Sequence, residues 1–207
     1  MTPPLLDLVV LVADKDMEQA VAGLLQRPIP LGISSPRYEI YRHPNRDNGC
    51  RTASHELLRP LSSLSRYAMV MFDREGSGGE DLPREDSERR VEKQLATNGW
   101  GDRCSALALD PELEIWMWVD SAELDRVIGW EAHSPPVREW LRSQGFAVGL
   151  AGKPVRPKEA LHKALRHTRK QPSASLFAAI ASRANLSRCT DPGFLRLKGT
   201  LQRWFPA

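Results

Sequence analysis

The stretch Tyr67-Ala-Met-Val-Met-Phe-Asp-Arg-Glu-Gly76 decides the fold class of this 207-residue chain. Its apolar run ends abruptly at Asp73 and Glu75, and a glycine-rich segment follows. A short apolar run bounded by turn residues is typical of a buried strand in an α/β sheet, where helices cover both faces. The stretch therefore predicts a buried strand with two acidic residues at its carboxyl end.

Acidic residues at this position are candidate metal ligands, because ligands of such sheets bind at the carboxyl ends of the strands. Asp73 and Glu75 could together hold a hard divalent cation. Mg²⁺ takes one or two protein carboxylates and keeps room for water and phosphate. The alternative is an acidic, solvated loop that follows a core strand.

The bulk composition predicts a cytoplasmic α/β protein with reduced thiols. No apolar stretch approaches the roughly 20 residues that span a bilayer. The first seven residues lack the basic start and small-residue cleavage site of a signal peptide. The three cysteines have no close spacing, which favours neither a disulfide framework nor a zinc site. We therefore expect no membrane partner.

The charge is unevenly distributed along the chain. Residues 1–150 contain 17 Lys/Arg and 24 Asp/Glu, a net charge of −7, whereas residues 151–207 contain 12 and 2, a net charge of +10. An acidic body beside a basic region suits a metal site next to a phosphate-binding surface. The alternative is that basic helices complement the acidic body within the same molecule.

Strand and helix patterns alternate through the first 110 residues and then become helical. Strands are predicted at 5–12, 37–42, 67–72 and 104–109, and helices at 17–26, from 52 or 54 to 64, at 85–98, and after Asp110, Ser134, Arg156 and Asp191. Asp16 is expected to cap the first helix. The alternation predicts a mainly parallel sheet flanked by helices. We expect an α/β core at 1–130 and a basic helical region at 131–207 packed on it.

Three acidic clusters fall at or just after predicted strand ends. They are Asp14/Asp16 with Glu18, Asp73/Glu75, and Asp110/Glu112/Glu114. If the strands are neighbours, the carboxylates meet at one sheet edge, and crowded carboxylates need a cation or raised pKa values. Bound Mg²⁺ or Mn²⁺ could activate water and stabilise charge in phosphodiester cleavage. The alternative is that each cluster only caps a helix.

The segment Asp110-Pro-Glu-Leu-Glu-Ile-Trp-Met-Trp118 is expected to begin a helix, because proline is tolerated in the first turn. On a regular helix Glu112 and Glu114 would lie about 200° apart and could not both face one metal. We therefore expect Glu114 to point toward the metal, with Trp116 as packing. Glu112 is expected to serve the capping turn.

Nucleophilic catalysis and nucleotide-loop motifs are not indicated. The five histidines lack metal-ligand spacing and are expected at the surface or on nucleic acid, and the Gly76–Gly79 stretch lacks the Lys-Ser/Thr of a phosphate-binding Walker loop. The basic region offers candidate nucleic-acid contacts at Lys158, Lys163, Arg166, Arg169 and Lys170. A solvated amphipathic helix would explain the same residues.

In the order of its segments the chain resembles, over most of its length, the Toprim-like family of unnamed function related to OLD-type nucleases and RloB-like abortive-infection proteins. The segments are 11–21, 70–75, Pro111-Glu-Leu-Glu-Ile-Trp116, Pro157-Lys158, and Cys189 with Phe194 and Leu197. The Pro-Glu-Leu-Glu-x-Trp match is the most specific of these. The resemblance implies a Toprim-like, Rossmannoid α/β fold.

The resemblance also implies how a metal would be held. Toprim domains hold Mg²⁺ with a Glu after the first strand and an Asp-x-Asp after a later one. Asp73 and Glu75 match the pair, with Glu in place of the second Asp, and Glu18 matches an acid in the first helix. Ala13 stands where the family has its first-strand Glu, so a neighbouring acid would have to serve. The resulting ligand set is Asp14, Asp16, Asp73, Glu75 and Glu114.

Three functions remain open from the sequence. The first is a Mg²⁺- or Mn²⁺-dependent nuclease acting on DNA or RNA within an anti-phage defence system, with Asp73, Glu75 and Glu114 at its active site. The second is a catalytically degenerate Toprim scaffold that binds a partner protein or nucleic acid, which Ala13 favours because a ligand or general base is missing. The third is a nucleotide-sensing regulator that uses the same strand ends.

Overall fold

Four parallel strands form the centre of the molecule. The structure is a computed structural model that describes residues 5–119, 122–149, 152–186 and 189–207. The strands are β1 (Leu6–Val12), β2 (Tyr38–Arg42), β3 (Ser65–Asp73) and β4 (Cys104–Leu109), in the order β2-β1-β3-β4. The predicted α/β class and parallel sheet are confirmed.

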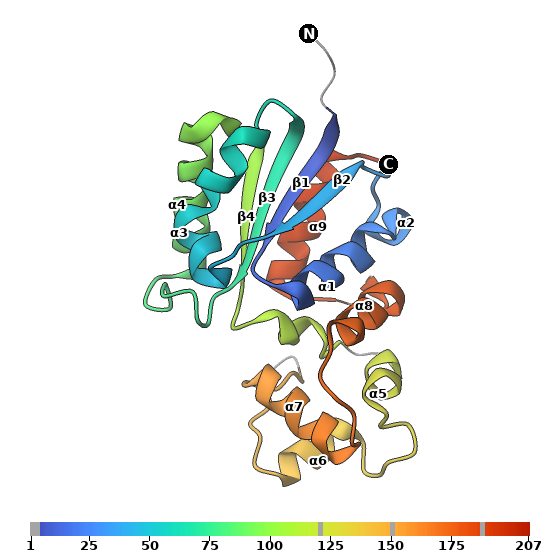
Figure 1. The fold of residues 1–207 in the computed structure, drawn as a ribbon. Helices are drawn as coiled ribbons and strands as arrows, with labels where there is room; N and C mark the ends of the chain where they lie inside the picture. The colour runs from blue at the N-terminus through green and yellow to red at the C-terminus, as the bar shows by residue number, and fades with distance from the viewer. Residues whose placement is uncertain (1–4, 120–121, 150–151, 187–188) are drawn as a thin grey trace.

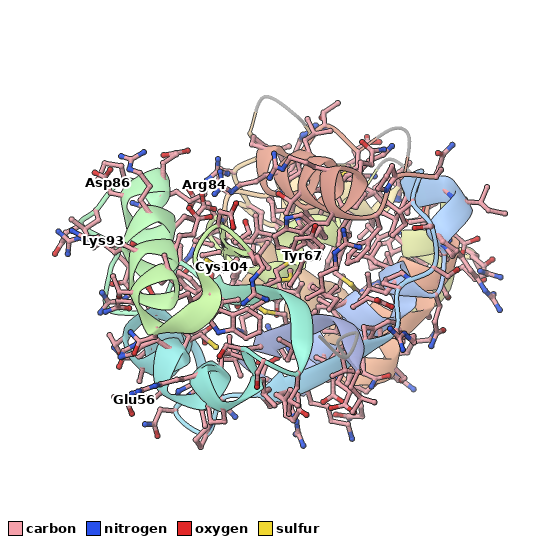
Figure 2. The ribbon with its side chains drawn as sticks, turned by 90° about the horizontal axis from the view of Figure 1, so that it is seen from above. Glu56, Tyr67, Arg84, Asp86, Lys93 and Cys104 are labelled. Atoms are coloured by element: carbon pink, nitrogen blue, oxygen red, sulfur yellow. The ribbon has the colours of Figure 1, made fainter. Side chains whose placement is uncertain are left out.

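Helices cover both faces of this sheet (Figures 1 and 2). On one face lie α3 (Arg46–Leu58) and α4 (Arg84–Leu95), and on the other lie α1 (Lys15–Leu25) and α9 (Pro192–Trp204). Leu8–Val12 of β1 are completely buried. Such unbroken apolar strands are what a sheet covered on both faces requires.

The first helices differ from the prediction at their starts. Asp14, not Asp16, caps α1: its backbone is extended, and its carboxylate accepts a hydrogen bond of 3.0 Å from Met17 N. Helix α3 begins at Arg46, six residues before the earliest predicted start. The short helices α2 (Pro28–Leu31) and η1 (Arg59–Leu61) precede β2 and β3, and η2 (Ala96–Trp100) follows α4.

The prediction of a regular helix after Asp110 is wrong. Glu112 keeps an extended backbone, with φ −160° and ψ 169°, and only the short 3-10 helix η3 (Leu113–Trp116) follows. The amide of Leu113 donates to the carboxylate of Asp73, at 2.8 Å. This contact from a neighbouring strand fixes the segment in a conformation that local helix signals did not indicate.

The helices after η3 lie in two places, beyond the ends of the strands and against the core. Helices α5 (Ala122–Ile128), α6 (Val137–Ser143) and α7 (Pro157–His167) lie beyond the carboxyl ends of the strands, and α8 (Ala174–Arg183) lies beside α1 (Figure 1). Helix α9 then returns to the sheet, where Trp204 stacks on Tyr67 with ring centroids 4.6 Å apart. No helix in the described ranges is long and apolar enough to cross a membrane.

Two carboxylates protect the open edge of β4. Glu88 and Glu92 of α4 each accept a backbone hydrogen bond of 3.0 Å, from Ala108 N and Ala106 N respectively. Arg196 of α9 lies 2.8 Å from Glu92 and 3.3 Å from Glu88. Edge strands with free N–H groups invite pairing with another chain. Here the side chains occupy those donors instead.

Gly23 of α1 lies where α8 packs closely on α1, and Gly199 of α9 offers a control in open space. A Cβ on Gly23 would lie 2.8 Å from Ala181 Cβ and 3.2 Å from Ala178 O, whereas one on Gly199 of α9 would meet no atom within 4 Å. We expect Gly23→Ala to lower the free energy of unfolding by about 1–3 kcal/mol through overpacking. Gly199→Ala should raise it by up to about 1 kcal/mol, because alanine favours helix. Urea unfolding measures both, and equal effects would contradict the close packing.

Candidate metal centre

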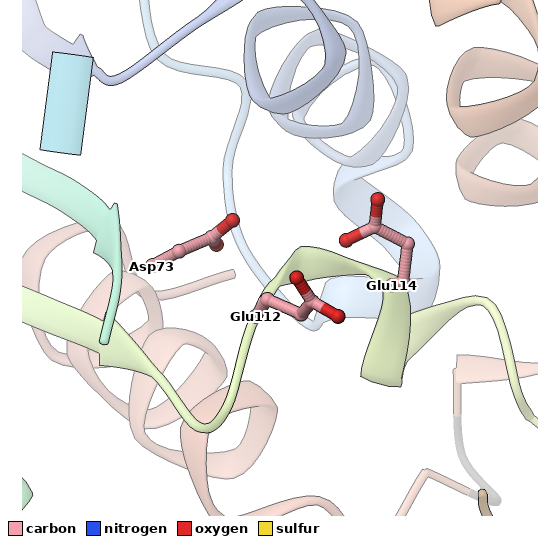
Figure 3. A group of neighbouring side chains, drawn as sticks. All are labelled: Asp73, Glu112 and Glu114. Carbon is pink, nitrogen blue, oxygen red and sulfur yellow. The ribbon is translucent and has the colours of Figure 1, made fainter. Parts of the chain in front are cut away.

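Three carboxylates converge at the carboxyl edge of the sheet (Figure 3). Asp73 ends β3, while Glu112 and Glu114 come from the segment that follows β4. One oxygen from each lies within 4.8 Å of the other two, a spacing from which a metal ion could be held. Glu112 and Glu114 are almost completely buried. The predicted meeting of Asp73 and Glu114 is therefore present, and Glu112 joins them.

The expectation that Glu112 and Glu114 could not share a metal is wrong. That expectation assumed a regular α-helix, but the extended backbone of Glu112 interrupts the helical spacing before η3 begins. Leu113, between the two acids, donates its amide to Asp73 Oδ1 at 2.8 Å. This hydrogen bond, together with the one from Glu75 N to Pro111 O, holds the segment of both glutamates beside the end of β3.

Lys158, at the start of α7, belongs to the same centre. Its Nζ lies 3.5 Å from Glu112 Oε2 and 3.8 Å from Glu114 Oε1, and its backbone N donates to Glu112 Oε1 at 3.0 Å. The sequence left two roles open for Lys158: a phosphate contact on a basic surface next to the metal site, or part of a basic helix that complements the acidic body. The structure places it against the acidic residues, because α7 begins beyond the carboxyl ends of the strands.

Asp47 is a further member that the sequence analysis missed. It lies in the first turn of α3 and accepts the backbone N–H of Asp73, at 2.8 Å. The predicted start of α3 at residue 52 or 54 left Asp47 in a loop. Its position five residues after β2 was the available signal, because the other acids of the centre also follow strand ends.

Three carboxyl groups at the centre, Asp73, Glu114 and Asp47, have raised pKa values. The pKa of Asp73 lies well above its ordinary value, because burial and the charges of Asp47 and Glu114 oppose ionisation. Burial also raises the pKa of Glu114 to about 7, although Lys158 opposes the shift. Burial, and more weakly Asp14, raises the pKa of Asp47. One ammonium group does not balance these carboxylates, so the centre favours a proton or a metal cation.

The other predicted metal ligands lie outside the group of three. Asp16 is half-buried, and its pKa is raised by burial and by Asp14; its charge in turn acts on Glu114, which places it at the border of the centre. Asp14 uses its carboxylate as the cap of α1. Glu75 is exposed, and its backbone N donates to Pro111 O. Asp110 pairs with Arg74 at 3.3 Å.

The basic residues follow α7 away from the centre. Lys163 is half-buried, while Arg166 and Arg169 are exposed. Lys170 donates from Nζ to Val127 O at 2.7 Å, so its ammonium group holds the end of α5.

The histidines do not all lie at the surface. His43 is buried, and its Nδ1 accepts from Asn45 N at 3.0 Å, so the surface expectation is wrong for this residue. His167 is exposed and lies against Trp140, with ring centroids 4.6 Å apart. Packing thus explains His43 without any ligand.

Comparison with known proteins adds no identification. No protein-family model, curated protein or solved structure matches this chain. An α/β sheet alone is compatible with many activities. The function therefore has to follow from the arrangement of side chains at the sheet edge.

The raised pKa of Glu114 predicts a pH dependence of the metal-free protein. Between its ordinary pKa of 4.5 and about 7, the folded chain retains a proton on Glu114 that the unfolded chain releases. The free energy of unfolding should therefore fall as the pH rises through this window, by at most about 3 kcal/mol for this group. Glu114→Gln should remove that part of the loss.

Urea unfolding at pH 5 and pH 8 in the presence of EDTA measures this effect. Glu75→Gln is the matched control, because Glu75 is exposed on a neighbouring loop, and it should keep the wild-type dependence. An equal loss of stability in Glu114→Gln and wild type would show that Glu114 ionises normally.

Proposed function

We propose that this chain is a metal-dependent phosphodiesterase that cleaves nucleic acid, with Mg²⁺ or Mn²⁺ held by Asp73, Glu112 and Glu114. The observation that carries the proposal is the approach of three carboxylate oxygens to within 4.8 Å of one another at the carboxyl edge of a parallel sheet. Oxygen donors are the ligands that these hard cations prefer. The raised pKa values of Asp73 and Glu114 support a cation-binding role.

The proposed chemistry divides between the metal and the chain. A bound divalent ion would supply an activated water and charge stabilisation for the phosphate. Asp47 orients the end of β3 by accepting the amide of Asp73, and Asp73 in turn accepts the amide of Leu113. Lys158 brings a positive charge beside Glu112 and Glu114, where a phosphate oxygen would gain from it.

The course of α7 favours a polymeric substrate over a small phosphate ester. The helix begins at the carboxylates with Lys158 and continues through Lys163 to Arg166, about 12 Å farther on at 1.5 Å per residue. Cations spaced along the helix beyond the centre suit a chain of phosphates.

The Toprim-like resemblance adds a biological context to the proposal. Proteins of that kind occur in anti-phage defence systems, so we propose that the chain acts there with other defence proteins. Ala13 occupies the position of the family's first-strand Glu. We propose that Asp16 takes over that role, because its charge acts on Glu114 while Asp14 is engaged in capping α1.

Two substitutions with similar chemistry test the ligand assignment. We expect Asp73→Asn to reduce cleavage of single-stranded and plasmid DNA and of RNA by at least a hundredfold with Mn²⁺, because it removes a ligand but keeps the acceptor for Leu113 N. Glu75→Gln should change the rate by less than threefold, because Glu75 is exposed outside the group. Cleavage unaffected by Asp73→Asn would reject the assignment.

A second candidate function is a non-catalytic scaffold that binds a partner protein or nucleic acid. Two observations favour it. Ala13 removes an acid that the family pattern requires, and the ammonium group of Lys158 already lies within 4 Å of two of the carboxylates. In a scaffold, this ammonium group would serve as the permanent counter-ion, and no metal would be needed.

Lys158→Gln separates the two candidates. If the carboxylates bind metal, removing a nearby positive charge should tighten Mn²⁺ binding about tenfold, because like charges repel strongly at this distance. The scaffold predicts no site tighter than roughly millimolar in wild type or variant, about −4 kcal/mol. Calorimetric titration with Mn²⁺ distinguishes these results, and Lys163→Gln is the control on the same helix.

A further inference from the structure

A depression opens beside the proposed metal centre, at the carboxyl ends of β1 and β2. Its volume is about 610 Å³, within the range usual for small-molecule sites. Asp14 lies in its wall, and the charge of Asp14 acts on both Asp16 and Asp47. The depression, which we name the β1–β2 pocket, therefore borders the acidic centre.

Two cations of the β1–β2 pocket form no ion pair among the described residues, although the charge of Arg46 acts on Asp16 at the border of the acidic centre. Lys15 and Arg46 line the pocket, and neither side chain forms a hydrogen bond or ion pair with another residue in the part of the chain that the structure describes. Its acids, by contrast, are engaged: Glu18 pairs with Arg42 at 3.0 Å, and Asp14 caps α1. The three cations of the lining, Lys15, Arg42 and Arg46, outnumber the two acids, Asp14 and Glu18, so the lining has a net charge of +1. A positive surplus favours an anionic ligand.

Arg46 is held in an unusual backbone conformation at this pocket. Its φ is 48°, in the left-handed region, and its N donates to His43 O at 3.0 Å. A residue other than glycine pays about 1–2 kcal/mol for this conformation. Such residues are concentrated at ligand sites. The strained backbone thus belongs to the same residue that brings a positive charge to the pocket.

An aromatic ring completes the pocket. Tyr41 of β2 lines it and is 39% exposed, while its hydroxyl donates to Glu39 and so keeps the ring in place. Nucleic-acid bases stack on exposed aromatic rings, whatever their sequence. A flat ring beside Lys15 and Arg46 matches a ligand that carries both a planar base and a phosphate.

We propose that the β1–β2 pocket binds one nucleotide unit, with its phosphate at Lys15 and Arg46 and its base on Tyr41. The unit comes either from a free nucleotide or from a strand, and only the strand source rests on the proposed nuclease function. In that case it is a nucleotide next to the one whose phosphate lies at Asp73, because Asp14 joins the pocket to the acidic centre.

Binding is measured by fluorescence anisotropy of a labelled single-stranded DNA decamer, with EDTA present so that no cleavage occurs. We expect Lys15→Gln with Arg46→Gly to weaken binding at least tenfold. Glycine adopts a φ near 48° without strain, so the variant should fold, which near-ultraviolet circular dichroism verifies. The matched control is Arg90→Gln with Lys93→Gln on α4, which also removes two charges; Lys93 points outward there (Figure 2).

Tyr41→Ala tests the base separately from the phosphate. It should weaken binding of the decamer several-fold but leave binding of an abasic decamer unchanged, because only stacking is lost. Displacement of the decamer by AMP would show that free nucleotides also enter the pocket, whereas failure of AMP to compete would assign the pocket to a strand. Either result keeps the nucleotide unit as the ligand.

Equal weakening by the pocket and α4 variants, or no weakening by either, would overturn the proposal. The proposed nuclease function fails separately. If the chain binds the decamer through the pocket but never cleaves it with Mn²⁺, the pocket proposal stands and the nuclease proposal is rejected.

Discussion

The hydrogen bond from Leu113 N to Asp73 Oδ1 is the interaction on which the acidic centre depends. It joins the end of β3 to the segment after β4 and places Glu112 and Glu114 on either side of the bonded amide. Three carboxylates then lie within reach of one ion. Burying like charges together is costly unless a cation or protons compensate them. The rest of the site can be understood as the response to that cost.

Part of the compensation comes from distant segments of the chain. Helix α7 contributes Lys158, which contacts both glutamates, and α3 contributes Asp47, which fixes the backbone of Asp73 but adds further negative charge. The raised pKa values of Asp73 and Glu114 show that the compensation is incomplete. A group of carboxylates whose charge the protein neutralises only in part is suited to a divalent cation.

The scaffold around the centre is rigid where the site requires it. The strands that deliver the acids are covered on both faces, and the open edge of β4 is occupied by Glu88 and Glu92, with Arg196 between them. The fixed sheet edge holds the carboxylates at one side of β1 and the basic β1–β2 pocket at the other. In the proposed function, a cation held by the carboxylates and the cations of the pocket would together attract a phosphate-containing ligand.

The sequence by itself determined the parallel sheet, the burial of β1 and β3, and the convergence of Asp73 with Glu114, because apolar runs and strand ends are local signals. Only the tertiary structure decided the place of Glu112, since its extended backbone depends on the contact between Leu113 and Asp73. Likewise Lys158 looked like part of a basic surface until α7 was placed over the strand ends. The periodicity of a sequence shows which face of an element is buried. It does not show which distant residue changes the backbone of that element or neutralises its charged side chains.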